Sequence, residues 1–497
     1  MLSTKTKKIF AVTAFLVTFL VTRIPFLGYD TINPDAVNWH FRSEQFIVGL
    51  KTGEFIKTYQ HYHPGVILMW VMGVPIEIYR QVNPQDRIYN EDNFITQHRL
   101  AKYSLVLVQL FLSLVLILSL AELIGFKKSI LAGSIFSFEP WFLGNSRLLH
   151  MDVLLALFLI LSLTYSYKFY LRGSVRHALV SGVFAGLAFL TKSLGLMAVL
   201  PAVILSLANK KQRAKLLGTL ALSTTATIFL LFPALWVRPV FVLSDIYNEG
   251  MRVGTRRGHE QVVMGVETDV AGPGFYPLVL ALKTSPLIWI GVVLFGYQII
   301  MKRRDNQKIL LYLTVFYLVY LIGISVVSKK IDRYVIPLFP WLGILAAFGF
   351  DRTIRVAKSQ ILLGLLATVA VVYPLIRFYP YYFTYTNPVL GTTEQANKIV
   401  GQKPFGVGIP ELKTLITENY GENVPLGFID RKPMSMIYQN SKLFDIRETG
   451  TGRYDLVILG PNEIMPEQVV AGEYKFSLDR TLYINGLAYW RIYKKLP

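Results

Sequence analysis

Apolar runs of about 20 residues, the length that crosses a bilayer, recur along this 497-residue chain and constrain its fold more than any other feature. Only 16% of the residues are charged, whereas soluble domains carry about 25%. We therefore predict a polytopic α-helical membrane protein with about 11 transmembrane helices. The predicted spans are residues 8–27, 101–124, 129–146, 151–171, 177–191, 194–208, 214–236, 284–301, 309–327, 333–350 and 357–377.

The first apolar run follows three lysines and ends without a small-residue cleavage motif, so we expect a retained anchor. Placing this N-terminus inside puts short basic loops on the same side, as the positive-inside rule requires. Topology thus explains much of the net charge of +20, and nucleic acid is not an expected partner. The inside residues are Lys5, Lys7, Lys8, Lys127, Lys128, Arg172, Arg176, Lys210, Lys211, Arg213, Lys215, Lys302, Arg303, Arg304, Arg352, Arg355 and Lys358.

The outside then receives two long loops, 28–100 and 238–283, and the segment after the last span. We predict a transmembrane domain over 1–378 and a small extracytoplasmic α/β domain over 379–497. The first loop carries helical apolar spacing at 41–50 and 66–79, which predicts helices along the outer surface. In the tail, 424–430, 454–460 and 488–494 resemble strands, and 410–420 resembles a helix ended by Gly421.

One basic cluster, Lys329, Lys330 and Arg333, falls on the outer side and breaks the positive-inside rule. Further outer cations are Lys192, Arg252, Arg256 and Arg257. Arg forks and Lys point charges recognise phosphate, so we expect an anionic ligand there. The simpler alternative is that these side chains snorkel and contact lipid headgroups. That alternative explains one or two cations more easily than it explains cations in three separate outer segments.

Two outer carboxylates are candidates for chemistry. Asp35 follows the first span, and Asp152 ends a tight turn that also holds Arg147 and His150. Either acid could cap a helix, but an Arg, a His and an Asp within six residues exceed what a cap needs. Paired acids suit general-base work or a divalent cation. His63, in a segment rich in Tyr and His, fits a substrate or structural role better than a metal role.

In their order and sidedness, these motifs resemble the glycosyltransferase C (GT-C) superfamily over residues 1–390, closest to protein O-mannosyltransferases and bacterial aminoarabinose transferases. The matching runs are the acid at Asp35, His63-Pro64-Gly65, the turn at Asp152, Thr191-Lys192-Ser193 and 330–337, which includes Tyr334. The resemblance implies Asp35 as the catalytic base. This chain has Asp35-Ala36 where the mannosyltransferases have Asp-Glu, and Gly65 where the family has a second proline. Metal use stays undecided, with Asp35, Asp152 and His63 as candidate ligands.

We therefore expect a multi-pass plasma-membrane enzyme that transfers a sugar, with inversion, from a polyprenyl-phosphate donor to an acceptor on the outer face. The acceptor could be a protein, a lipid or a glycan. One alternative is a transporter or flippase of lipid-linked sugars, although repeated halves, which many transporters have, are not seen here. Another is a membrane-anchored binding or structural protein whose tail does the work, in which both aspartates are only helix caps.

Overall fold

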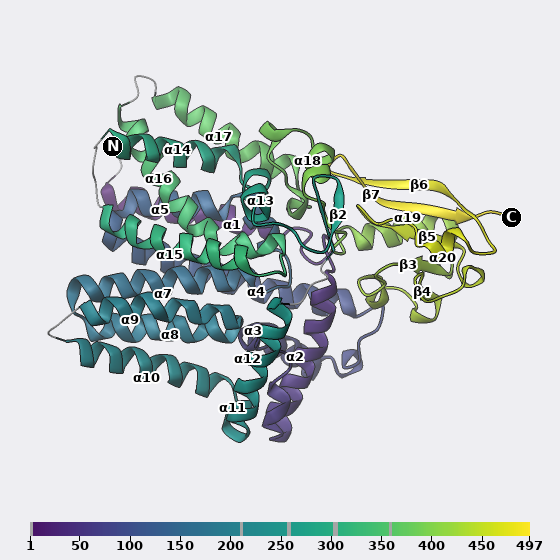
Figure 1. Cartoon of the computed structure of the whole chain (residues 1–497), viewed down its shortest axis with the longest axis horizontal. Coiled ribbons are helices and arrows are strands. Elements are labelled where there is room, and N and C mark those ends of the chain that lie inside the picture. Colours follow the sequence, from purple (N-terminus) through teal and green to yellow (C-terminus); the bar gives the residue numbers. More distant parts are fainter. Residues whose placement is uncertain (1–2, 209–211, 256–259, 302–306, 357–359) are drawn as a thin grey trace.

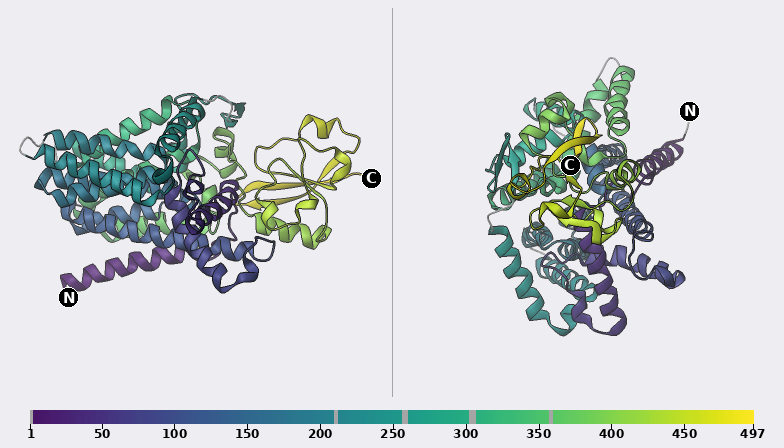
Figure 2. Two further views of the ribbon diagram at one scale, coloured as in Figure 1. Left: turned by 90° about the horizontal axis from the view of Figure 1, so that it is seen from below. Right: turned by 90° about the vertical axis from the view of Figure 1, so that its right-hand side faces the viewer.

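The computed structural model describes residues 3–208, 212–255, 260–301, 307–356 and 360–497. It consists of a helical bundle with a small sheet region at one end, opposite the N-terminus (Figure 1; Figure 2, left). One helix covers at least half of each predicted span. These helices are α1 (Thr4–Arg23), α4 (Phe94–Ile124), α5 (Phe126–Ser137), α7 (Asp152–Arg172), α8 (Val175–Thr191), α9 (Val199–Ala208), α10 (Arg213–Leu231), α14 (Pro286–Ile300), α15 (Gln307–Val326), α16 (Phe339–Val356) and α17 (Gln360–Arg377).

Within the described residues, five helical segments are long and apolar enough to cross a membrane, or six if a bent helix pair forms one span. The chain is therefore an integral membrane protein, while the predicted count of about 11 spans is not confirmed. Two of the five segments are mostly buried inside the protein, residues 332–351 and α7, and α7 packs against α4, α8 and α16. Its first turn carries Asp152 and its last turn Arg172, each at the end that suits the helix dipole.

The predicted span 129–146 is broken in the structure. The helix α5 ends at Ser137, and α6 (Pro140–Ser146) starts after Glu139. A proline lacks the N–H that a helix interior needs and favours the first helical position, which explains the break. A second break separates α13 (Phe275–Lys283) from α14, with a bend of 110°. Glu139 links the two breaks, because it accepts hydrogen bonds from the backbone N–H and the hydroxyl of Ser285.

The two long loops fold mainly into helices, including α2 (Pro34–Thr52) and α3 (Val66–Val82), which confirms the helices predicted in the first loop. The second loop supplies α12 (Pro239–Thr255) and a hairpin of β1 (Gln261–Val263) and β2 (Val266–Thr268). Both α2 and α12 run across the end of the bundle rather than along it (Figure 1). Shorter helices are α11 (Ala234–Val237), α18 (Thr393–Ile399) and α20 (Glu467–Val470).

The terminal sheet has the strand order β4-β3-β5-β7-β6. The three predicted strands are confirmed as β3 (Leu426–Phe428), β5 (Leu456–Leu459) and β7 (Leu487–Lys495), and the predicted helix as α19 (Ile409–Tyr420). Two strands escaped prediction. The strand β4 (Leu443–Asp445) is only three residues long, and β6 (Phe476–Ile484) is an edge strand with charged residues at its centre.

The sheet region is joined to the bundle immediately before Asp35. Thr31 forms a β-bridge with Val407, the N–H of Ile32 donates to Gly406 O at 3.0 Å, and the N–H of Gly408 donates to Asp30 O at 2.9 Å. Gly406 has a φ of +66°, and a Cβ there would lie 2.0 Å from Ile32 O, so only glycine fits. The segment 403–408 is thus held against the start of α2.

Candidate active site

Asp35 lies in the first turn of α2, where Asn33 rather than Asp35 is the N-cap residue. Its Oδ2 atom accepts a hydrogen bond from Arg333 Nη2 at 3.2 Å and lies 3.4 Å from His150 Nε2. The Asp35 side chain is 39% exposed. The carboxylate is therefore bound by basic side chains on one side and accessible to solvent on the other.

Asp152 is almost fully buried at the start of α7. Its Oδ1 accepts a hydrogen bond from Lys192 Nζ at 3.1 Å, and its Oδ2 lies 2.9 Å from His150 Nδ1. Arg333 Nη1 is 3.7 Å from the same Oδ2. One histidine and one guanidinium thus contact both carboxylates, and the two acids share one site.

Lys192 stands where α8 ends and the 3₁₀ helix Ser193–Ala198 begins. Its Nζ lies 4.0 Å from the centre of the Tyr334 ring, so a cation–π contact adds to its ion pair. Tyr334 and Arg333 are neighbours in the 3₁₀ helix Asp332–Leu338, and Tyr334 O accepts a hydrogen bond from Tyr320 on α15. The sequence run at 330–337 therefore delivers two residues to the site.

His63 lies beside this site. The next glycine, Gly65, has a φ of +59°, donates its N–H to Thr191 O at 3.3 Å, and leaves room for the Trp39 ring. Burial, together with the charge of Lys192, holds the pKa of His63 well below its usual range. His63 is therefore a neutral neighbour of Lys192.

The basic side chains of the site favour the ionised form of Asp35. Burial opposes the ionisation of Asp35, but His150 and Arg333 outweigh it and hold the pKa of this carboxyl well below its usual range. Asp35 is consequently ionised at physiological pH, as a proton acceptor must be.

Phe405, in the loop joined to the start of α2, is a site residue that sequence analysis did not select. Its ring lies 4.3 Å from Arg333 Cζ and stacks on Phe383, which stacks in turn on Trp141. The ring centroids are 5.2 Å and 5.0 Å apart. An aromatic column from α6 therefore ends on the guanidinium that joins the two carboxylates.

Other predicted residues lie elsewhere. Arg147 donates to Asp30 and to the carbonyls of Thr22, Arg23 and Pro25. Lys330 Nζ donates to the carbonyls of Ser325 and Val327. Arg252 is exposed and paired with Glu249. Arg256 and Arg257 lie outside the described residues.

The donor set does not fit the divalent cation that sequence analysis left open. Arg333 and His150 occupy the space between Asp35 and Asp152, so a second positive charge would meet repulsion there. Across the described parts of the chain, no group of three or more His, Cys, Asp or Glu side chains is arranged so that it could hold a metal ion.

Comparisons with known proteins add to this geometry. The profile of a family described as dolichyl-phosphate-mannose-protein mannosyltransferase matches residues 98–237, which include His150, Asp152 and Lys192. The fold also matches ArnT from Cupriavidus metallidurans bound to undecaprenyl phosphate, with a TM-score of 0.55, 14% identity and 97% of each chain covered. The chain has the GT-C superfamily fold.

Two further GT-C structures are similar. The apo state of the same ArnT has a TM-score of 0.52 at 14% identity, over 98% of this chain and 97% of that one. The Archaeoglobus fulgidus oligosaccharyltransferase tethered to an acceptor peptide has a TM-score of 0.48 at 10% identity, over 92% of this chain and 69% of that one. No curated protein sequence matches the chain. The GT-C resemblance predicted from the sequence is confirmed.

Proposed function

We propose that this protein is a glycosyltransferase that moves a sugar, with inversion, from a polyprenyl-phosphate donor to an acceptor hydroxyl on the outer face of the membrane. The observation that carries the proposal is the pair of carboxylates joined by His150 and Arg333. It is supported by the GT-C fold and by a fold relative that binds undecaprenyl phosphate.

In the proposed reaction, Asp35 takes the proton of the acceptor hydroxyl while that oxygen attacks the anomeric carbon from the face opposite the phosphate. The bond between the anomeric carbon and the phosphate oxygen breaks, and the lipid phosphate leaves with the bonding electrons. Arg333 and Lys192 are the cations placed to stabilise the charge that grows on this phosphate. His150, which contacts both acids, orients them.

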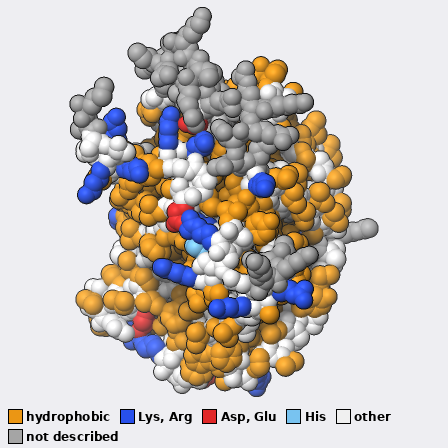
Figure 3. Space-filling model, turned by 90° about the vertical axis from the view of Figure 1, so that its left-hand side faces the viewer, with side chains coloured by type: hydrophobic (Ala, Val, Ile, Leu, Met, Phe, Trp, Pro, Cys, Tyr) orange, Lys and Arg blue, Asp and Glu red, His pale blue; other side chains and the backbone are white. Residues whose placement is uncertain are grey.

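The proposed orientation places the site outside. The N-terminus and the terminal sheet lie at opposite ends of the bundle (Figure 1). At the N-terminal end, Lys and Arg side chains are scattered over the visible surface and few acidic ones appear (Figure 3). Basic ends face the cytoplasm, so the end with Asp35 and the domain proposed over 379–497 would face outward, where lipid-linked donors replace nucleotide sugars.

Gene deletion in the source cell, followed by mass spectrometry of envelope glycans, tests the proposal. Loss of one sugar, restored by the wild-type gene but not by Asp35→Asn or Asp152→Asn, is the expected result. The control is Asp92→Asn, which removes an exposed carboxylate in the same loop. Restoration by all three variants would contradict the proposal, and a lipid-linked sugar trapped on the inner leaflet would favour a transporter instead.

A further inference from the structure

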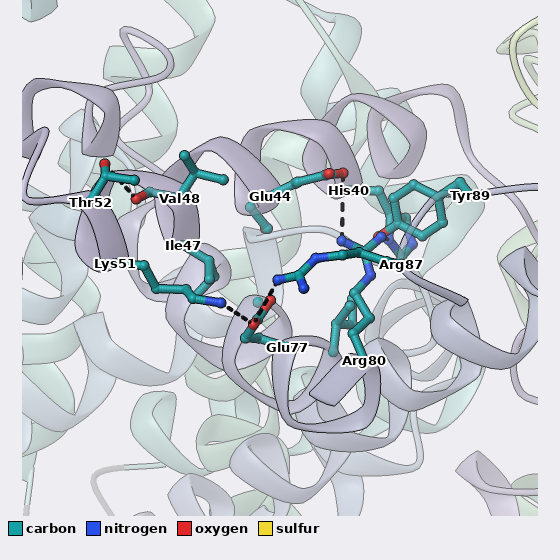
Figure 4. A pocket seen from close by; sticks show the side chains of 13 residues that line it. His40, Glu44, Ile47, Val48, Lys51, Thr52, Glu77, Arg80, Arg87 and Tyr89 are labelled. Carbon is teal, nitrogen blue, oxygen red and sulfur yellow. Dashed lines mark hydrogen bonds and ion pairs between the residues drawn. The ribbon is translucent and has the colours of Figure 1, made fainter. Parts of the chain in front are cut away.

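A cavity of about 230 Å³ lies between α2 and α3 (Figure 4). Ser43 and Glu44 line it from α2, Glu77 and Arg80 from α3, and Arg87 and Tyr89 from the segment that follows. A helix rises 1.5 Å per residue, so Ser43 lies about 12 Å along α2 from Asp35. The cavity is therefore separate from the proposed reaction centre.

Arg80 is the central cation of this cavity, and its side chain is only 4% exposed. Its Nε donates to Gln97 Oε1 at 2.8 Å, and its Cζ lies 4.4 Å from the centre of the Tyr89 ring. Its closest carboxylate oxygen, Glu44 Oε2, is 3.7 Å from Nη1. Among the residues that the structure describes, none accepts a hydrogen bond from the buried Nη2. A buried guanidinium with a free N–H is costly unless a ligand completes it.

Ser43 provides a second free group in the same cavity. The residue is 1% exposed, and within the described ranges its hydroxyl has no hydrogen-bond partner. An arginine N–H and a serine O–H that line one cavity are the donor types that bind oxyanions. The two free groups come from different helices, so the packing of α2 on α3 brings them together.

The charges that line the cavity leave a positive surplus. Glu77 is paired with Lys51 at 2.6 Å and with Arg87 at 3.6 Å (Figure 4). The remaining acid, Glu44, faces Arg80 at a longer distance. His40 adds no charge, because its ring nitrogens are engaged by Tyr89 and His98, and burial with the charge of Arg80 lowers its pKa to about 3.

We propose that this cavity binds a phosphate ester group through Arg80 and Ser43, as a second anion site of the protein. Both helices lie at the end of the membrane-spanning bundle, where lipid phosphates are found. Ile47 and Ile76 are apolar residues of the lining, so they would contact the carbon atoms next to the phosphate. A soluble phosphate ester and a phospholipid headgroup both present this chemistry.

The test uses the full-length protein, purified in detergent and freed of lipid, with inorganic phosphate and phosphatidylglycerol as separate probes. Binding is measured by calorimetry for phosphate and by native mass spectrometry for the lipid. We expect Arg80→Gln to weaken binding about tenfold to a hundredfold, and Ser43→Ala about threefold to tenfold. The matched control is Arg172→Gln, which removes an exposed arginine paired with Glu122 at the end of α7 and should bind as wild type does.

Each outcome decides the proposal. Binding of inorganic phosphate identifies a soluble phosphate as sufficient, whereas binding of phosphatidylglycerol alone identifies a lipid headgroup; either supports the site if Arg80→Gln or Ser43→Ala weakens it. If Arg80→Gln fails to fold, Ser43→Ala decides, because it removes a single hydroxyl. Failure of both probes to bind the wild type would overturn the proposal, and so would binding by both Arg80→Gln and Ser43→Ala that equals binding by Arg172→Gln. Where Arg80→Gln does not fold, equal binding by Ser43→Ala and Arg172→Gln overturns it. None of these measurements depends on sugar transfer.

Discussion

Asp30 and Asp35 lie five residues apart, and each is surrounded by cations, yet their surroundings differ. Asp30 is 3% exposed and accepts hydrogen bonds from Lys102 at 3.0 Å and Arg147 at 2.8 Å. Nη1 and Nη2 of Arg147 donate hydrogen bonds to three backbone carbonyls. The Asp30 cluster, meaning Asp30, Lys102 and Arg147, is therefore closed to solvent and hydrogen-bonded throughout.

The Asp35 cluster, meaning Asp35, Asp152, His150, Lys192 and Arg333, is open by comparison. In the described part of the chain, Arg333 Nη1, His150 Nδ1 and Asp152 Oδ2 are buried atoms without a well-aligned hydrogen bond. Buried polar groups without a hydrogen-bond partner lower the stability of the folded state, and they can form hydrogen bonds with a ligand. Similar sets of acidic and basic side chains can therefore have different roles. Where backbone carbonyls accept hydrogen bonds from the basic side chains, the cluster stabilises the fold. Where these donors have no such acceptor, they remain able to bind a ligand.

The largest expected effect is on transfer. Asp35→Asn should lower the rate of sugar transfer by about 10²–10⁴-fold, the usual contribution of a general base, while the protein stays folded, because this side chain is 39% exposed. Rates with purified protein and folding monitored by thermal unfolding separate the two effects. A variant that retains near-normal transfer would remove Asp35 as the base.

The second effect is on folding. Asp30→Asn leaves the buried Lys102 and Arg147 without their carboxylate, so it should lower the free energy of unfolding by about 3–5 kcal/mol. The measurement is the thermal unfolding midpoint in detergent, with Asp92→Asn as the control. An unchanged midpoint would show that the Asp30 cluster is no more structural than the Asp35 cluster.

Arg333→Ala should weaken donor use about tenfold to a hundredfold, because a charge-assisted hydrogen bond is lost. Arg333→Lys should restore only part of this, since the planar fork is absent. Lys330→Ala, which removes a lysine bonded to carbonyls in the structure, should have a smaller effect. Titration with the lipid donor checks all three, and equal effects would refute a special role for Arg333.

Phe405→Ala should raise the KM for the donor about twofold to thirtyfold, because a cation–π contact is worth about 0.5–2 kcal/mol. Phe405→Trp should preserve donor binding. If the alanine variant lowered kcat and stability but left KM unchanged, Phe405 would be a packing residue that does not position Arg333.

The smallest effect concerns pH. Burial opposes ionisation of Asp30, but Arg147 and Lys102 hold its pKa below the usual range. The stability that it contributes is therefore fully present above the pKa of an unfolded aspartate, about 4, and is lost as pH falls through the lower folded value. The difference in unfolding midpoint between wild type and Asp30→Asn should thus stay constant from pH 8 to pH 5. A difference that shrinks in this range would contradict the depressed pKa.

The sequence predicted much of the helical framework because apolar runs and short basic loops are local signals. It predicted the GT-C fold through the order and sidedness of short motifs that resemble that superfamily. It also selected Asp35, His150, Asp152, Lys192, Arg333 and Tyr334, which the structure brings together. These residues share one side of the membrane in the predicted topology, and sidedness narrows the possible contacts. Their catalytic and binding roles stay predictions.

What the sequence could not predict depends on contacts between distant segments. Arg147 is three residues before His150, yet it turns to Asp30, because the carbonyls at the end of α1 surround it there. Phe405 lies in a Pro-Gly segment that carries no periodic pattern, and the backbone pairing of residues 30–32 with residues 406–408 explains its position. A single sequence gives no signal for either contact.

The joint between the terminal sheet region and the start of α2 also limits how such enzymes can be recombined. A chimera cut near residue 378 would receive a foreign loop in place of Pro404-Phe405-Gly406, while its own segment at 30–32 would still offer Ile32 and Asp30 as backbone partners. The borrowed loop would have to supply a glycine opposite Ile32 and a ring above Arg333. A tail whose loop lacks that glycine or that ring would therefore have to be exchanged together with the segment 28–35 that it contacts.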